Sequence, residues 1–301
     1  MIKETLKDSN QLKEQFNPNN QINPEFLSLL NRNLRDFISP FLERSKENYQ
    51  EMPEISEKIF GRPVSCEDFR QLFSLDDYGL NSETLVQKDV ASMDETGSVN
   101  TEAIRVISVF YQRLKDGSLD YKGLARACFF RDPDSEKNVM HTNAVKLEKS
   151  IQKNGLGTVI VLQREKFCQE NGVNEIWGAA HTFDNYVGAY ASASQGGYEF
   201  KDSNELQEIR DRFQSYAASK RIFLDDQVLD RLKRPQDFAR FKAEDEDGLT
   251  RPIGKEFLLD ENEEVFWQFR LKLPLDGEAL KERKNFLDSR GKKDLIEKYY
   301  S

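Results

Sequence analysis

One stretch of the chain, from Ser150 to Phe183, restricts the possible folds more than any other: SIQKNGLGTVIVLQREKFCQENGVNEIWGAAHTF. Residues 158–162 are apolar and rich in β-branched side chains, which favours a buried strand. Asn171–Val173 is a turn signal, and the apolar run after it favours a second strand. His181 stands where this second run ends. We therefore expect two adjacent strands joined by a turn, and then a helix that begins near His181.

A helix is also expected directly before these strands, over residues 141–155. Thr142 or Asn143 can cap its first turn, because both side chains accept hydrogen bonds from backbone N–H groups. Gly155 stands where helices commonly end, since glycine adopts the left-handed conformation without strain. With a further strand over residues 124–130, the central part of the chain reads strand, helix, strand, strand, helix.

The two ends of the chain carry patterns that are typical of helices. Residues 23–49, 100–117 and 203–242 have apolar stripes at helical spacing. A hairpin is expected about residues 260–264, between two apolar runs. These patterns predict an α+β protein with three regions: a helical N-terminal region (1–117), an α/β core (118–200), and a helical C-terminal region with a β-hairpin (201–301).

Composition and charge narrow the functional classes. The chain has 301 residues, a formal net charge of −9 and 38% hydrophobic residues, which is enough apolar material for a folded protein. A net negative charge argues against attraction of the whole surface to nucleic acid or to anionic membranes. The three cysteines form no CxxC pair, and the sequence has no long apolar run. We therefore expect a cytoplasmic protein with reduced thiols, no metal site and no membrane partner.

The order of features in the central stretch resembles the ParB/sulfiredoxin-like fold. In that family a helix with a "SIxxxGL"-type ending leads into a hydrophobic strand, a turn and a second strand, and a glycine-containing motif then begins the next helix. The matching residues lie between Val139 and Ala193: Ser150, Ile151, Gly155, Leu156, Val159–Leu162, Ile176, Trp177, Gly178 and His181. The resemblance implies that residues 118–200 form a ParB/sulfiredoxin-like core that binds a nucleotide.

Elementary chemistry favours a phosphate site at the corner between the second strand and the next helix. A glycine at a strand end lets the backbone approach a ligand closely, and the N-terminus of a helix attracts an anion. His181 and Thr182 would add hydrogen bonds to the phosphate oxygens. The expected nucleotide-binding residues are Gly178, Ala179, Ala180, His181 and Thr182, and the expected cofactor is a nucleoside triphosphate with Mg²⁺.

Three positions depart from the family pattern. His181 and Thr182 occupy the candidate positions of the arginine that binds phosphate in ParB-like members. Ala180 stands where sulfiredoxin has its reactive cysteine. Sulfinic acid reductase chemistry is therefore not expected, and no catalytic residue is assigned.

A second expectation concerns nucleic acid. Residues 210–242 combine Lys and Arg with aromatic side chains, a combination that binds phosphate backbones and stacks on bases. The candidate residues are Arg210, Arg212, Lys220, Arg221, Lys233 and Arg234. An amphipathic helix pair that buries its aromatic residues explains the same pattern, and we favour this interpretation. DNA association stays open beside it.

Two other functions stay open. The segment "MHTNAVKLEKSIQKNG" also resembles the first catalytic segment of ADP-ribosyltransferases, which implies NAD as the substrate. Tyr186 or Tyr190 would then contact the nicotinamide, and Glu263 or Glu264 would orient the ribose. In the third hypothesis the core is a scaffold with a degenerate site, which binds a protein partner and carries out no chemistry. Whether the chain is an enzyme is undecided at this point.

Overall fold

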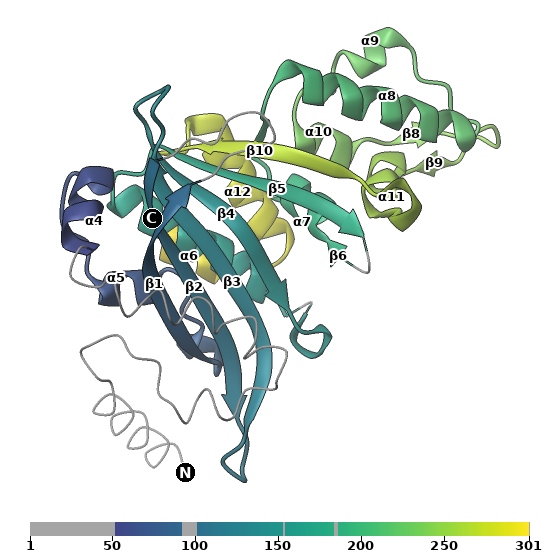
Figure 1. Cartoon of the computed structure of the whole chain (residues 1–301). Helices are drawn as coiled ribbons and strands as arrows, with labels where there is room; N and C mark the ends of the chain where they lie inside the picture. Colours follow the sequence, from purple (N-terminus) through teal and green to yellow (C-terminus); the bar gives the residue numbers. More distant parts are fainter. Residues whose placement is uncertain (1–51, 92–100, 153, 184–185, 301) are drawn as a thin grey trace. The chain divides into compact units, whose positions relative to one another are not determined.

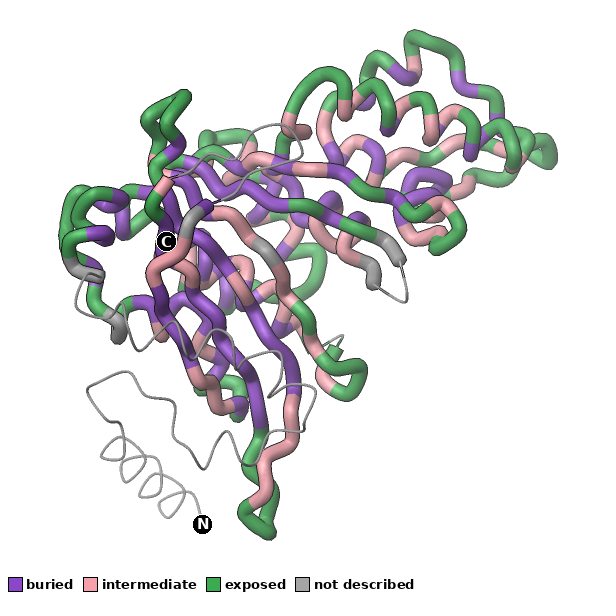
Figure 2. The backbone as a smooth tube through the Cα atoms, in the orientation of Figure 1, coloured by how far each residue is buried: buried purple, intermediate pink, exposed green. Residues whose placement is uncertain are grey.

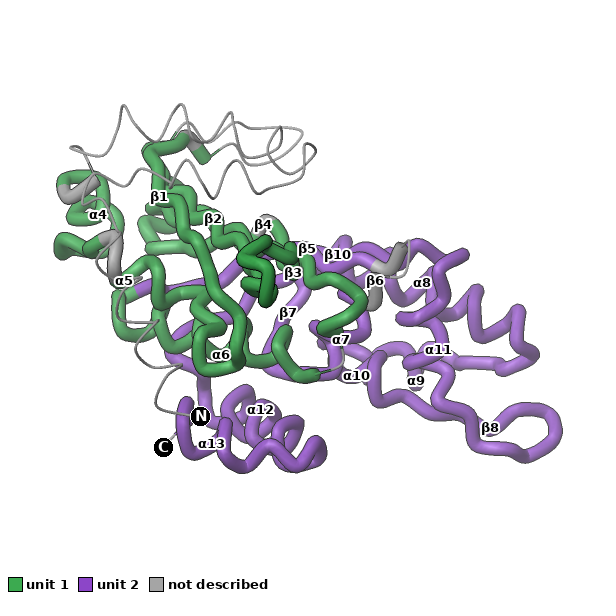
Figure 3. Tube along the Cα trace, turned by 90° about the horizontal axis from the view of Figure 1, so that it is seen from below, with its two compact units in different colours: residues 1–172 green, residues 173–301 purple. Residues whose placement is uncertain are grey.

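The computed structural model describes residues 52–91, 101–152, 154–183 and 186–300 of the chain. The helix expected over residues 23–49 lies outside these described residues. The chain divides into two compact units, Met1–Gly172 and Val173–Ser301, which Figure 3 shows in different colours. Each unit combines helices with antiparallel strands, so the predicted α+β class is confirmed.

The described part of the first unit begins with helices and continues with a sheet (Figure 1). Helices α4 (Met52–Phe60) and α5 (Cys66–Gln71) and the 3-10 helix η2 (Asp76–Tyr78) come first. The sheet strands are β1 (Asn81–Ala91), β2 (Thr101–Arg113), β3 (Leu119–Arg131) and β4 (Asn138–Leu147), which pair antiparallel in this order. The 3-10 helix η3 (Lys149–Ile151) and helix α6 (Leu156–Glu170) follow.

Aromatic side chains join these helices to one face of the sheet. Phe60 of α4, Phe69 of α5 and Phe167 of α6 all contact Phe129 of β3, with ring centroids 5.4 to 5.7 Å apart. All four side chains are buried. Burying a side chain of this size stabilises a fold by about 2 kcal/mol. Because all three contact the same residue, α4, α5 and α6 cover the same face of the sheet.

The middle strands of this sheet are buried on both faces, which explains one difference from the sequence prediction. Nearly every residue from Ala103 to Tyr111 in β2 is buried, and Figure 2 shows a similar buried run in β3. A strand buried on both faces loses the apolar–polar alternation that identifies strands, so its apolar residues also fit a helical spacing. The predicted helix over residues 100–117 is therefore wrong.

The element types predicted on either side of Gly155 are reversed in the structure. Residues 138–147 form strand β4 instead of a helix, and residues 156–170 form helix α6 instead of a strand. Gly155 is the N-cap of α6, with φ at +80°, so it begins a helix rather than ending one. The run from Gln163 to Lys166 consists of good helix formers, and it outweighs the β-branched residues before it.

The second unit contains paired antiparallel strands and most of the described helices. Strand β10 (Phe266–Lys272) pairs antiparallel with β5 (Glu175–Phe183) and β7 (Glu199–Phe200), and β6 (Tyr186–Val187) pairs with the end of β5. The helices are α7 (Gly188–Gln195), α8 (Ser203–Ser219), α9 (Asp226–Leu229), α10 (Pro235–Arg240), α11 (Ile253–Leu259), α12 (Gly277–Ser289) and α13 (Lys293–Tyr300).

The predicted hairpin about residues 260–264 is replaced by helix α11, the 3-10 helix η4 (Glu261–Glu263) and strand β10. A short hairpin forms elsewhere, where β8 (Ala243–Glu244) pairs with β9 (Thr250–Arg251) around the acidic turn. Aromatic contacts again form the core, because Phe213 of α8 packs on Phe238 and Phe257. Within the described ranges, no helix is both long and apolar enough to cross a lipid bilayer.

Candidate functional site

The expected phosphate corner is a continuous strand in the structure. The predicted nucleotide-binding residues, Gly178 to Thr182, are consecutive residues of β5, which then pairs with β6. Gly178 lies opposite Phe269 of β10, and a Cβ atom at Gly178 would be only 2.5 Å from the Phe269 ring. Glycine is needed at this position to make room for that ring. The next described helix, α7, begins only at Gly188, so Gly178–Thr182 lacks the helix start on which the anion site was predicted.

His181 packs on an aromatic side chain. Its ring centroid lies 4.5 Å from that of Phe266, the residue opposite it on β10. Desolvation lowers the pKa of His181, so the imidazole is neutral near pH 7 and adds no positive charge. The next helix, α7, begins only at Gly188. The position of His181 is therefore explained by packing on Phe266.

The predicted nucleic-acid-binding cations make contacts within the second unit. The contacts are Arg210 with Asp230, Arg221 with Glu246, Arg234 with Glu278 and Glu282, Arg212 with the Glu263 carbonyl, and Lys220 with the Tyr216 ring, while Lys233 is exposed. Aromatic residues of the same stretch, including Phe213 and Phe238, are buried. The amphipathic interpretation accounts for these residues, and DNA association is not supported.

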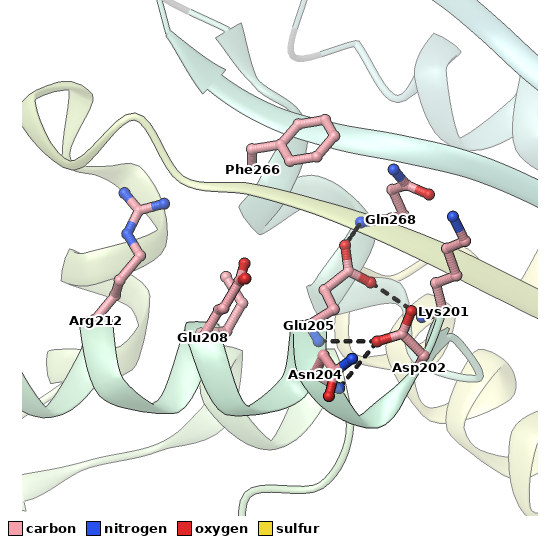
Figure 4. A pocket seen from close by; sticks show the side chains of 9 residues that line it. Lys201, Asp202, Asn204, Glu205, Glu208, Arg212, Phe266 and Gln268 are labelled. Atoms are coloured by element: carbon pink, nitrogen blue, oxygen red, sulfur yellow. Dashed lines mark hydrogen bonds between the residues drawn. The ribbon is translucent and has the colours of Figure 1, made fainter. Parts of the chain in front are cut away.

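A cavity of about 260 Å³ lies at the start of α8 (Figure 4). Its lining residues are Lys201, Asp202, Asn204, Glu205, Glu208, Ile209, Arg212, Phe266 and Gln268. The Glu205 carboxylate accepts hydrogen bonds from the backbone N–H groups of Gln268, at 2.5 Å, and Lys201, at 3.1 Å. Burial raises the pKa of Glu205. This carboxylate thus joins α8 to β10, and we assign the cavity no chemistry.

The start of α6 has the features of an anion site. Its N-cap Gly155 provides no side-chain cap, and its first turn contains no acidic residue. A Cβ atom at Gly157 would meet no atom within 4 Å, so the space beside the first turn is open. The first N–H groups of any α-helix have no partner inside the helix, and the positive end of the helix dipole is located there. An oxyanion can therefore approach the amides of Leu156 and Gly157.

Hydrogen bonds hold this helix start close to the end of β4. The Gln152 side chain donates to the Leu147 carbonyl at 2.7 Å, which ties the loop to the last residue of the strand. Arg164 of α6 donates to the Thr142 hydroxyl of β4 at 2.8 Å. The loop between them is exposed at Lys149 and Asn154. The helix start is thus both fixed and open to solvent.

An acidic side chain with a shifted pKa lies in the same part of the sheet. Glu83 of β1 shares a row of the sheet with Lys146 near the end of β4, through Val109 and Leu124. Burial raises the pKa of Glu83 to about 7, although Arg70 lowers it. A carboxyl group with this pKa can accept a proton near neutral pH, which suits a general base.

Polar residues also form a row across the middle of this sheet. Gln87, Arg105, Cys128 and His141 lie directly opposite one another on β1 to β4. Asp89 and Arg126 share their face, because residues two apart in a strand point the same way. We call these six residues the polar row. Burial raises the pKa of Cys128 to about 12, so its thiol is not a nucleophile.

Comparisons with known proteins give weak similarities. No protein-family model and no curated protein matches the chain. Among solved structures, Naa50 from Arabidopsis thaliana, in complex with the bisubstrate analogue CoA-Ac-MVNAL, is 14% identical, with a TM-score of 0.25 over 32% of this chain and 58% of its own. An aminoglycoside 6'-N-acetyltransferase complexed with coenzyme A is 13% identical, with a TM-score of 0.24 over 56% of this chain and 72% of its own. A GNAT-family acetyltransferase from Staphylococcus aureus Mu50 is 11% identical, with a TM-score of 0.25 over 58% of this chain and 84% of its own. The chain spans less than two thirds of the length of the first of these.

The expected ParB/sulfiredoxin-like core is therefore wrong. Its helix–strand–strand order is replaced by the strand–helix–strand order of β4, α6 and β5. The expected function, nucleotide binding at the Gly178–Thr182 corner, depends on this core and is also wrong. The expected cofactor, a nucleoside triphosphate with Mg²⁺, is wrong as well, because Gly178–Thr182 lies within strand β5 and the helix start that was to bind its phosphates is not there. The ADP-ribosyltransferase alternative loses its helix over residues 141–155, and nothing favours the scaffold alternative.

Sequence reasoning missed the start of α6, Glu83 and the polar row. Gly155 was interpreted as the end of a helix. Gly155 and Gly157 indicate an anion site only if a helix begins at them, as α6 does. The polar row has no local signal, because its members are far apart in the sequence and only the strand register joins them. A burial-raised pKa at Glu83 likewise depends on tertiary packing.

Proposed function

We propose that this chain is an acyltransferase, which binds the pyrophosphate of an acyl-coenzyme A at the start of α6 and transfers the acyl group to an amine. The observation that carries the proposal is the uncapped, glycine-rich start of α6 directly after β4. Coenzyme A or its analogue is the ligand named for two of the solved structures described above. We expect the reaction in the cytoplasm, where free thiols such as Cys128 and Cys168 stay reduced.

The α6 start fits a pyrophosphate better than the other helix starts of similar length do. At α8 and α12, the side chains of Asp202 and Asp276 accept hydrogen bonds from the first-turn amides and place a negative charge there. At α6 the cap is Gly155, so the amides stay available and no carboxylate repels a phosphate. Backbone amides at the end of a helix dipole are a common binding site for phosphate groups.

The reaction needs a group that removes a proton from the amine. The amine nitrogen attacks the thioester carbonyl, a C–N bond forms, the C–S bond breaks, and the thiolate leaves with one proton to become the free thiol of coenzyme A. Glu83, with a pKa of about 7, is our candidate for the base. Its row places it about 14 Å, or three strand spacings, from Lys146 on β4.

The proposal is tested by calorimetric titration of coenzyme A into the full chain and into Gly157→Glu. Because the space beside Gly157 is open, the new side chain fits without displacing its neighbours, but its carboxylate repels the pyrophosphate. We expect the affinity to fall at least tenfold. The side chain in Gly157→Gln has the same size but no charge, so this variant should lose less affinity for coenzyme A.

A matched control is available at another helix. A Cβ atom at Gly277, in the first turn of α12, also meets no atom within 4 Å. Gly277→Glu therefore adds the same charge to a helix start that the proposal does not use, and it should leave the affinity for coenzyme A unchanged. Equal affinities for wild type and Gly157→Glu, or no binding to wild type, would contradict the proposal.

A further inference from the structure

The polar row contains a buried amide that forms no hydrogen bond with any described residue. The Gln87 side chain is 2% exposed, and neither its Nε2 nor its Oε1 atom has a hydrogen-bond partner among the described residues. A buried polar group without a hydrogen bond destabilises a fold, so such groups usually have a partner. The Gln87 amide offers both a donor and an acceptor. The group that satisfies it must offer the same in return, as an amide does.

The charges of the polar row are also unbalanced. Arg105 forms an ion pair with Asp89. Arg126 forms no ion pair within the described part of the chain, and its Nε atom is buried without a hydrogen bond. Counted over the six described residues of the polar row, two guanidinium groups and one carboxylate carry a surplus of one positive charge. Arg105 and Arg126 are only half-buried, so an anion from solvent can reach this face.

We propose that the polar row binds a carboxylate ligand with an adjacent amide group, such as an N-acylated amino acid or the last residue of a peptide. The Arg126 fork would bind the carboxylate, and the Gln87 amide would pair with the amide of the ligand. One surplus positive charge matches a carboxylate better than a doubly charged phosphate. Two strand spacings and an offset of two residues along the strand separate the Cα atoms of Gln87 and Arg126, about 12 Å in all, which leaves room for one residue between the side chains.

This inference does not depend on acyl transfer, because it rests only on residues in the middle of the sheet. It is tested without coenzyme A, so the two proposals can fail separately. The probe is N-acetylglycine, added at millimolar concentrations to the full chain in a calorimetric titration. N-acetylglycinamide lacks the carboxylate and acetate lacks the amide. Both should bind at least tenfold more weakly than N-acetylglycine.

Two substitutions locate the binding site. Arg126→Gln removes the charge and the fork, and it should weaken N-acetylglycine binding at least tenfold. Arg126→Lys keeps the charge and should lose less affinity for N-acetylglycine. This variant tests the same side chain if Arg126→Gln does not fold. Arg131→Gln, at the exposed end of the same strand, is the matched control and should bind like wild type.

Gln87→Leu separates a binding role from a purely structural one. It removes the unsatisfied amide, so the thermal midpoint without ligand should rise, while N-acetylglycine affinity should fall about tenfold. The inference is overturned if wild type does not bind N-acetylglycine, or if Arg126→Gln and Gln87→Leu both bind it as wild type does.

Discussion

Arg164 of α6 and Thr142 of β4 are joined by a hydrogen bond of 2.8 Å between the guanidinium and the hydroxyl oxygen. The Arg164 side chain is only 2% exposed. A charge buried this deeply is tolerated only when hydrogen bonds replace its hydration. The contact therefore fixes the position of α6 on the strand that precedes it, and with it the position of the proposed phosphate site.

The first prediction concerns this contact. Thr142→Val keeps the shape of the side chain but removes the acceptor, so it should lower the free energy of unfolding by about 2 kcal/mol. Urea denaturation measures the change. Thr101→Val is the control, because the Thr101 hydroxyl makes only an exposed hydrogen bond of 3.4 Å to the Arg131 carbonyl. If Thr142→Val and Thr101→Val lower the free energy of unfolding by the same small amount, the contact does not fix α6.

The second prediction concerns Glu83 and pH. The pKa of Glu83 is raised from 4.5 to about 7 in the fold, so the native state keeps a proton that the unfolded chain releases. The stability therefore falls as the pH rises from about 4.5 to about 7. Glu83→Gln has no proton to release, so it avoids this loss and should be more stable than wild type at pH 8 by about 3 kcal/mol. Urea denaturation at pH 5 and pH 8 tests this, and parallel pH profiles would refute it.

The third prediction concerns a buried hydroxyl pair. Thr84 of β1 and Ser108 of β2 lie opposite each other, with their hydroxyl oxygens 2.8 Å apart. Either Thr84→Val or Ser108→Ala alone leaves one buried hydroxyl unsatisfied and should lower the free energy of unfolding by about 1 to 2 kcal/mol. The double variant removes both hydroxyl groups, so it should lower the free energy of unfolding by less than the sum of the two single variants. A double-mutant cycle measures the difference, and strict additivity would show that the pair does not interact.

The fourth prediction concerns Glu282 of α12 in the second unit. Its carboxylate accepts hydrogen bonds from the Gly197 backbone, from Gln236 and from Arg234, at 2.9 to 3.0 Å. Glu282→Gln removes the charge from a buried network and should lower the free energy of unfolding by about 3 kcal/mol, measured by urea denaturation. Glu278→Gln is the matched control one turn earlier, since Glu278 also pairs with Arg234 but its side chain is 69% exposed. The control should cost less than about 1 kcal/mol.

The sequence predicted elements correctly where local signals agreed. The turn after Asn171 and the strand β5 were expected, and so was a helix over the residues of α8, whose apolar residues recur at helical spacing. The predictions failed where burial on both sides removed the periodicity. In β2 the buried run fits helical spacing, and in α6 the buried Val159 and Ile160 look like a strand.

The candidate sites were harder to predict from the sequence than the fold was. Gly155 has the left-handed conformation that ends many helices, yet here it begins one, and the residue type alone does not separate the two cases. Gly178 was interpreted as a glycine beside a ligand, whereas the Phe269 ring occupies that space. Arg126 and Gln87 share a face only because three strands align in register, which no local pattern encodes.

The central claim is that the amides at the start of α6 bind the pyrophosphate of coenzyme A. The most direct measurement is the amide chemical shifts of the ¹⁵N-labelled chain during titration with coenzyme A and, separately, with pantetheine, which lacks the pyrophosphate. We predict that coenzyme A shifts the signals of Leu156 and Gly157 more than those of the capped helix starts at Asn204 and Ala279, and that pantetheine does not. Shifts at Leu156 and Gly157 that are absent, or that pantetheine reproduces, would contradict the account.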